Sequence, residues 1–322
     1  MSKITTERVA FKPFEYQWAY DYWFAQQNAH WLHTEINMQE DVTNWRENLS
    51  VEEKNVVEFI LKGFTQTECE VGNYWSSYIP QWFPIPEIKM MAQTFGAFET
   101  IHATAYSYLN DTLGLDDFEA FLEDEATMNK LKTLMDVDPS ETSLKKILLS
   151  VALFSALGEG IQLFSSFAVL LSFRKSNRLK GVGQQMIFSV KDESLHSEAG
   201  CKLFRSAIEE NPHIWTDNFK ASIYEGIDIG LLNEFKYIDK MFEQGELESI
   251  TSEQLKNFMF DRANRKLVEL NLVPQYNVDK VLFDEMSWFY ALVAGEKQTD
   301  FFAGRETGYA KPNADWNDND LF

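Results

Sequence analysis

Cysteine is nearly absent from the sequence: only Cys69 and Cys201 occur in 322 residues. Two cysteines are too few for a disulfide framework, and neither has a Cys-x-x-Cys partner. We therefore expect both side chains to be thiols buried in the core. A redox mechanism that uses a closely spaced pair of thiols is excluded.

Basic residues are scarce relative to acidic ones: 29 lysines and arginines stand against 50 aspartates and glutamates, which gives a net charge of −21. Phosphate backbones and anionic lipid headgroups repel such a surface. We therefore expect neither a nucleic-acid partner nor a membrane partner. The stretch from Met1 to Arg8 also lacks the apolar segment of a secretion signal, which predicts a cytoplasmic protein.

The chain also lacks the features that divide a fold into parts. No Gly/Ser-rich or low-complexity run interrupts it, and almost no segment alternates polar and apolar residues as a strand would. We therefore predict one all-α domain over residues 1–295. Residues 296–322 are acidic near their end, with isolated aromatics such as Trp316 and Phe322, and they predict a flexible tail that docks on a partner.

Apolar residues at helical spacing predict a series of long helices. A capping box at Ser50 and Glu53 begins one of them, and Gly114 ends another. The run from Ile147 to Phe173 is apolar enough to resemble a membrane span, but Glu159 near its centre favours a helix buried in a large bundle. The predicted helices cover about residues 15–27, 51–79, 87–113, 140–173, 183–210, 216–244, 251–271 and 279–294.

Polar residues interrupt the apolar stripe of the helix predicted over 87–113. Glu99, His102 and Tyr106 are three and four residues apart, so a carboxylate, an imidazole and a phenol lie on one helix face that is otherwise apolar. The Glu-x-x-His pair recurs at Glu193 and His196 in another predicted helix. Burying such polar groups without partners is costly, so we expect each pair to have a partner that satisfies it.

A lone carboxylate precedes each Glu-x-x-His pair in a separate predicted helix. Glu68 comes 31 residues before Glu99, and Glu159 comes 34 residues before Glu193, which indicates a two-fold internal repeat. Four glutamates from four helices, with histidines from two of them, are the ligand set of ferritin-like dinuclear carboxylate proteins. Oxygen and imidazole ligands without thiolates suit iron or manganese better than structural zinc.

These motifs together resemble the small, radical-generating subunit of class I ribonucleotide reductase, and the similarity extends over nearly the whole chain. The matched stretches are Glu99-x-x-His102-x-x-x-Tyr106, Glu159-Gly160-Ile161, a segment that begins Phe173-Arg174-Lys175-Ser176-Asn177 and ends Asp192-Glu193-x-x-His196, and Phe301-Phe302-Ala303-Gly304-Arg305-x-Thr307-x-Tyr309. The resemblance implies a ferritin-like helical bundle, normally a homodimer, with a dinuclear metal site in its core. It also implies reduction of ribonucleoside diphosphates to deoxyribonucleotides, with activity only in the presence of the large subunit.

The resemblance further implies a role for each site residue. Glu68, Glu99 and His102 would hold one metal ion, and Glu159, Glu193 and His196 would hold the other. Tyr106 would store the radical, although the residue pattern alone is equally compatible with an ordinary core tyrosine. Asp192, bonded to His102, and Trp31 would form an inner relay, and Tyr309 would pass the oxidising equivalent to the large subunit. The chain end at Leu321 and Phe322 would dock on that subunit.

Two departures from the family pattern bear on the metal. Many iron-tyrosyl members have aspartate at the position of Glu68, whereas members that use manganese have glutamate there, as this chain does. Leu163 stands where many members have a phenylalanine of the radical pocket, whereas Phe167 matches the next phenylalanine of that pocket. Two iron ions are the favoured cofactor, with manganese–iron and two manganese ions as alternatives. The alternative functions are a ligand-binding dinuclear-metal oxidase of the same fold and a ferroxidase.

Overall fold

The computed structural model describes residues 3–115, 125, 127–130, 138 and 140–302. Within these residues the chain is helical and contains no strand, as predicted. The α-helices are α1 (Gln17–Asn28), α2 (Gln39–Thr43), α3 (Val51–Asn73), α4 (Ile79–Trp82), α5 (Pro86–Leu113), α8 (Leu144–Leu153), α9 (Phe164–Ser172), α10 (Lys180–Glu210), α11 (Asp217–Met241), α12 (Ser252–Glu269) and α13 (Lys280–Phe302). Segments of π-helix are η2 (Asn44–Asn48), η3 (Tyr74–Tyr78) and η4 (Phe154–Gln162), and short 3₁₀ turns are η1 (His33–Glu35), η5 (Phe173–Ser176) and η6 (Pro212–Ile214).

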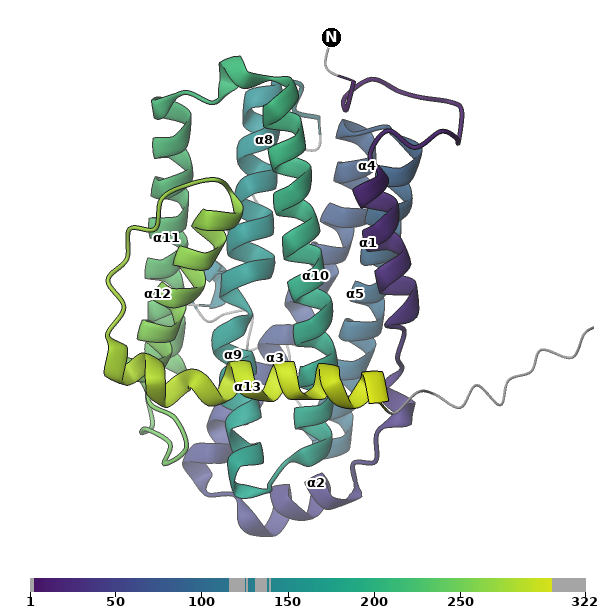
Figure 1. Cartoon of the computed structure of the whole chain (residues 1–322). Helices are drawn as coiled ribbons and strands as arrows, with labels where there is room; N and C mark the ends of the chain where they lie inside the picture. The colour runs from purple at the N-terminus through teal and green to yellow at the C-terminus, as the bar shows by residue number, and fades with distance from the viewer. Residues whose placement is uncertain (1–2, 116–124, 126, 131–137, 139, 303–322) are drawn as a thin grey trace, which may run out of the picture.

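The long helices α3, α5, α8–α9, α10, α11 and α12 run side by side as a bundle, with α1 against α5 on one flank (Figure 1). The predicted end signals are present. Ser50 Oγ accepts a hydrogen bond from the Glu53 amide at 3.2 Å, and the Glu53 carboxylate accepts one from the Ser50 amide at 3.0 Å. Gly114 adopts φ +72°, a left-handed conformation that glycine tolerates at a helix end.

The helix predicted over 140–173 consists of α8, η4 and α9. Every residue of η4 and α9 is buried, so this apolar segment is a core helix of the bundle, as expected, and not a membrane span. The apolar spacing predicts an uninterrupted helix here, whereas in η4 the backbone leaves the α-helical hydrogen-bond pattern. Such π-helical segments are rare and often occur at functional sites. Glu159 lies within it.

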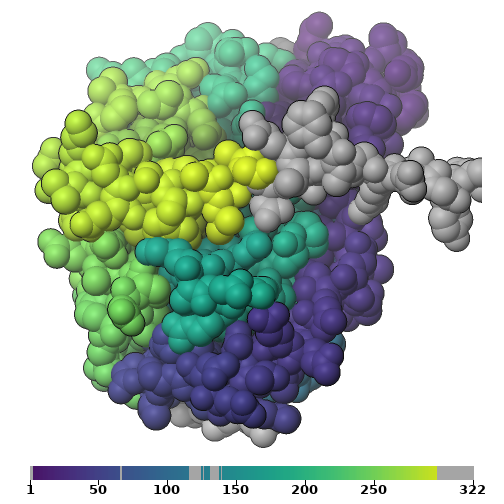
Figure 2. Space-filling view, turned by 60° about the horizontal axis from the view of Figure 1, so that its bottom comes forward, coloured from purple at the N-terminus to yellow at the C-terminus, as the bar shows by residue number. Residues whose placement is uncertain are grey.

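Helix α13 crosses the bundle at a steep angle to the long helices and forms a ridge on the outside of the molecule (Figures 1 and 2). Phe289 anchors it to the core, with its ring centroid 6.1 Å from that of Phe164 and 5.0 Å from that of Phe258. The helix continues to Phe302, past the domain boundary expected at residue 295. Tyr309 and the expected docking segment lie outside the described residues, so the tail remains a prediction.

One expectation about the cysteines is wrong. Cys201 is fully buried, and burial raises the pKa of its thiol to about 12. Cys69, however, is exposed. Neighbouring residues on an α-helix project about 100° apart, so the helix that turns Glu68 into the bundle turns Cys69 away from it.

Candidate metal centre

The six predicted ligands meet in the middle of the bundle. Glu68 comes from α3, Glu99 and His102 from α5, Glu159 from η4, and Glu193 and His196 from α10, and each is at most 1% exposed. Their ligand atoms form two groups, each within 4.8 Å: Glu68, Glu99, His102 and Glu193, and then Glu99, Glu159, Glu193 and His196. Glu99 and Glu193 belong to both groups, so the carboxylate of either residue could serve an ion at either position.

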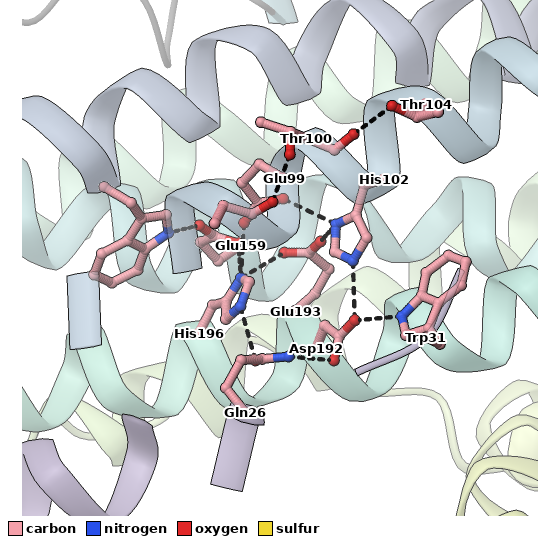
Figure 3. A network of polar contacts seen from close by, with 12 residues as sticks. Gln26, Trp31, Glu99, Thr100, His102, Thr104, Glu159, Asp192, Glu193 and His196 are labelled. Atoms are coloured by element: carbon pink, nitrogen blue, oxygen red, sulfur yellow. Dashed lines mark hydrogen bonds and ion pairs between the residues drawn. The ribbon is translucent and has the colours of Figure 1, made fainter. Parts of the chain in front are cut away.

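The two histidines turn the same nitrogen toward the carboxylates (Figure 3). Nδ1 of His102 lies 2.9 Å from both Glu99 Oε2 and Glu193 Oε1, and Nδ1 of His196 lies 2.8 Å from Glu99 Oε1. The opposite nitrogens, Nε2, point away from the cluster and have acceptors of their own. An acceptor at Nε2 favours the tautomer that carries its proton there and leaves Nδ1 free to bind a metal ion.

Crowding of buried charge shifts the pKa values of the cluster. Burial, together with the charges of Glu193 and Glu99, raises the pKa of Glu68 well above its usual range, and burial with Glu193 does the same for Glu159. Burial alone would lower the pKa of His196, but Glu99 and Glu193 raise it to about 9. Four carboxylates in such a site need compensating positive charge. Two divalent cations supply that charge in full.

Unpartnered oxygens provide a direct test of whether metal ions fit. Neither carboxylate oxygen of Glu68 accepts a hydrogen bond from a donor in the described part of the chain, although the side chain is 1% exposed. Buried polar atoms without a partner are rare and costly. The carboxylate and imidazole side chains around these oxygens are metal ligands that suit iron or manganese, so the residues present fit a dinuclear metal centre.

Tyr106 lies one helical turn beyond His102 and is fully buried. Its ring centroid is 6.2 Å from that of His102 and 4.9 Å from that of Phe64, on which it stacks. Phe167 contacts Phe64 in turn, at 5.0 Å between centroids. Burial and the charge of Glu68 raise the pKa of the Tyr106 hydroxyl well above its usual value, so this phenol is protonated and lies close to the carboxylate cluster.

Asp192 connects the cluster to Trp31, as the family resemblance implies (Figure 3). Its Oδ2 accepts hydrogen bonds from His102 Nε2 at 3.0 Å and from Trp31 Nε1 at 2.8 Å. Gln26, on α1, donates its Nε2 to Asp192 Oδ1 at 2.8 Å and accepts from His196 Nε2 at 3.1 Å. Asp192 and Gln26 together therefore fix both histidine rings.

Two residues of this site, Gln26 and Trp75, are not indicated as site residues by the sequence pattern. Gln26 has no distinguishing spacing, and it reaches the cluster only because α1 packs against α5 and α10. Trp75 donates its indole Nε1 to Glu159 Oε1. It follows Glu68 by seven residues on the same helix face, so its spacing indicated burial but not a polar contact.

A family model described as "Ribonucleotide reductase, small chain" matches residues 8–282. The chain belongs to the ribonucleotide reductase small-chain family. It is 34% identical to the probable ribonucleoside-diphosphate reductase small subunit of Invertebrate iridescent virus 3, over 98% of this chain and 88% of that protein. It is 26% identical to the ribonucleoside-diphosphate reductase subunit beta of Chlamydia pneumoniae, over 92% and 88%. This small chain is accordingly part of an oxidoreductase, and the family membership favours that function over the two alternatives.

Solved structures share the fold of this small chain. The R2 subunit of ribonucleotide reductase from Clostridium botulinum aligns with a TM-score of 0.81 at 20% identity, over 90% of this chain and 92% of that one. The dimanganese(II)-NrdF of Streptococcus sanguinis aligns with a TM-score of 0.75 at 19% identity, over 87% and 99%. The ferritin-like bundle predicted from the sequence is therefore confirmed. The individual ligand and radical assignments remain predictions.

Proposed function

We propose that Glu68, Glu99, His102, Glu159, Glu193 and His196 would hold two metal ions that, once activated by an oxidant such as oxygen, would accept one electron from Tyr106. We propose further that the oxidising equivalent stored on Tyr106 is passed to a large subunit that reduces ribonucleoside diphosphates. One observation supports the proposal most strongly: two ligand groups share Glu99 and Glu193 beside a buried phenol. The ligands proposed for one ion are Glu68, Glu99 and His102, and those for the other are Glu159, Glu193 and His196.

Each residue then has a defined task. The bound ions supply the power for one-electron oxidation. Tyr106 gives up one electron together with its phenolic proton, and Glu68, whose charge acts on that phenol, is the candidate acceptor of the proton. Burial of Tyr106 against Phe64, which in turn packs on Phe167, keeps the neutral radical away from water and from reductants.

We propose that the oxidising equivalent leaves through the hydrogen bonds that join His102, Asp192 and Trp31, and then through Tyr309. The sequence has no Gly-rich phosphate-binding loop to bind a nucleotide and no closely spaced thiol pair to reduce one. The path therefore needs a large subunit that supplies both.

Two iron ions are the favoured cofactor, and Glu68 in place of aspartate keeps manganese–iron and two manganese ions as alternatives. The dimanganese(II)-NrdF of Streptococcus sanguinis, which contains two manganese ions, shares this fold. Metal-free protein should be activated with iron alone, manganese alone and the mixture in the presence of oxygen. The metal that gives the highest nucleotide reduction with the large subunit identifies the cofactor.

The first prediction concerns metal content. Protein loaded with iron or manganese should hold about two ions per chain, the number expected for a ferritin-like dinuclear site. His102→Ala and Glu193→Ala should each lower that number, measured by elemental analysis after desalting. His213→Ala is the matched control, because that histidine is exposed and far from the ligand groups in the sequence. Unchanged metal content in both site variants would contradict the assignment.

The second prediction concerns the tail. Removing residues 309–322 deletes Tyr309 and the aromatic anchors Trp316 and Phe322, so nucleotide reduction with the large subunit should fall to background. Metal content and the radical signal should be unchanged, because the ligands lie in the bundle. Full turnover by the truncated chain would show that docking does not depend on this segment.

The third prediction concerns assembly. The family resemblance supports a homodimer, so light scattering should give twice the 37.4 kDa mass of one chain. A mass of one chain at micromolar concentration would contradict it. The measurement should be made on metal-loaded protein, since ligand binding shifts the equilibrium toward the folded form.

A further inference from the structure

The backbone around Glu159 is bonded by side chains from other helices. Arg262 of α12 donates Nε and Nη2 to the carbonyl oxygen of Gly160, at 3.0 and 2.8 Å. Lys130 donates Nζ to the carbonyl oxygen of Gln162 at 2.6 Å. Ser197 of α10 donates Oγ to the carbonyl oxygen of Ser155 at 2.6 Å. Three separate parts of the chain thus bond the η4 backbone near its start, at Ser155, and near its end, at Gly160 and Gln162.

The side chains of Arg262 and Lys130 are buried, so keeping their charges out of water costs free energy. Arg262 is 7% exposed, and its guanidinium lies 3.5 Å from the centroid of the Phe164 ring. Lys130 is 5% exposed and pairs with Glu234 at 3.1 Å. Taking charged side chains out of water costs several kcal/mol, so cations directed at main-chain carbonyls need a compensating benefit. An ordinary α-helix needs no such donors, because its interior carbonyls are bonded within the helix.

The packing around η4 is also specific to this arrangement. A Cβ on Gly160 would lie 2.7 Å from both the Lys266 stem and Ser197 Oγ, closer than real Cβ atoms approach. A Cβ on Gly200 of α10 would lie 2.6 Å from the Cβ of Ser155. Glycine at these two positions lets α10 and α12 approach the η4 backbone closely.

We propose that Arg262 and Lys130 are positioning residues for the metal centre: they hold η4 in its π-helical form and so direct Glu159 toward the ion it shares with His196. The carbonyls that they bond, at Gly160 and Gln162, lie one and three residues beyond Glu159. A shift from π-helix to α-helix would change the rotation of Glu159 about the helix axis and move its carboxylate. This inference rests on the proposed dinuclear centre.

Manganese binding by Arg262→Gln tests the proposal with a readout other than activity. Metal-free protein is titrated with Mn²⁺ by calorimetry and followed by electron paramagnetic resonance. We expect roughly 10–100-fold weaker binding of the ion at Glu159 and His196, the range seen when partners of metal ligands are removed. Binding of the ion at Glu68 and His102 should change less than about twofold, so the spin-coupled signal of two ions should give way to that of one isolated ion.

The matched control is Arg265→Gln, one turn along α12, where the arginine is exposed and pairs with Asp261. It should bind both ions as the unchanged protein does. If Arg262→Gln does not fold, Arg262→Lys decides, because it keeps the charge but cannot offer two parallel donors to one carbonyl. Folded Arg262→Lys should lose affinity for the same ion.

The possible outcomes separate the two hypotheses. If the unchanged protein binds two ions and the folded Arg262 variants do so equally well, the positioning role is wrong and the proposed function stands. Equal weakening of both ions would also overturn it, since that indicates general damage to the fold. If the unchanged protein does not bind two ions, the dinuclear centre itself is wrong.

Discussion

Tyr106→Phe is expected to abolish the organic-radical signal and to lower nucleotide reduction by roughly a thousandfold or more. The effect is large because the substitution removes the group that carries the oxidising equivalent, whereas most substitutions only weaken an interaction with such a group. The substitution deletes one hydroxyl from a ring that is fully buried against Phe64, so the packing is preserved. Phenylalanine has no acidic proton to release with the electron, and its oxidation is much harder than that of a phenol.

The measurement is electron paramagnetic resonance after activation with oxygen, recorded beside turnover with the large subunit. Tyr74→Phe is the matched control: Tyr74 is also buried, at 1% exposed, but its hydroxyl bonds Ser150 at 3.0 Å and not the carboxylate cluster. That control should keep both signal and turnover. Metal content should be equal in all three proteins, so a loss of activity cannot be attributed to an empty site.

A fully active Tyr106→Phe protein would indicate a different mechanism. It would mean that the oxidising equivalent is stored on the metal ions, as Glu68 in place of aspartate leaves open. The longer glutamate side chain can bridge or chelate the ions and so fail to accept the phenolic proton. The presence of a buried phenol next to the charge of Glu68 favours the tyrosyl radical.

The long helices and the clustering of the six candidate ligands could be predicted because both follow from residues repeated at helical spacing. Glu99 and His102 recur as Glu193 and His196. Once the helical period of the apolar residues is known, a polar residue that falls on the apolar face can be recognised in the sequence. The helix ends at Ser50 and Gly114 also follow from local chemistry. These features depend on residues close together in the chain.

The unpredicted features depend on contacts between distant segments. The π-helical form of η4 is held by Arg262 and Lys130, which lie 102 and 32 residues from the carbonyls that they bond. Gln26 reaches Asp192 across 166 residues. No local periodicity encodes such partners. The exposure of Cys69 likewise follows from the rotation of α3 about its axis, which composition alone does not specify.

Asp192→Asn is expected to lower nucleotide reduction by roughly a hundredfold or more while the Tyr106 radical still forms. The aspartate accepts three hydrogen bonds, from His102, Trp31 and Gln26. Asparagine keeps the shape, but one of its two terminal atoms is a donor and the negative charge is lost. Either the Trp31–His102 side or the Gln26 side then faces an unmatched donor, and buried bonds to charged groups are worth about 1.5–3 kcal/mol each.

The expected separation between radical formation and turnover is what identifies Asp192 as part of the transfer path. Because Asp192 is not among the grouped ligand atoms, metal content and radical yield should stay within about twofold of the unchanged protein, whereas turnover with the large subunit falls. Glu209→Gln is the matched control, since that carboxylate is on the same helix but exposed. Loss of metal and turnover together would assign Asp192 to orientation of His102 alone. Turnover within about threefold of the unchanged protein would exclude the path through Asp192, because the oxidising equivalent would then cross the bundle without the carboxylate that joins His102 to Trp31.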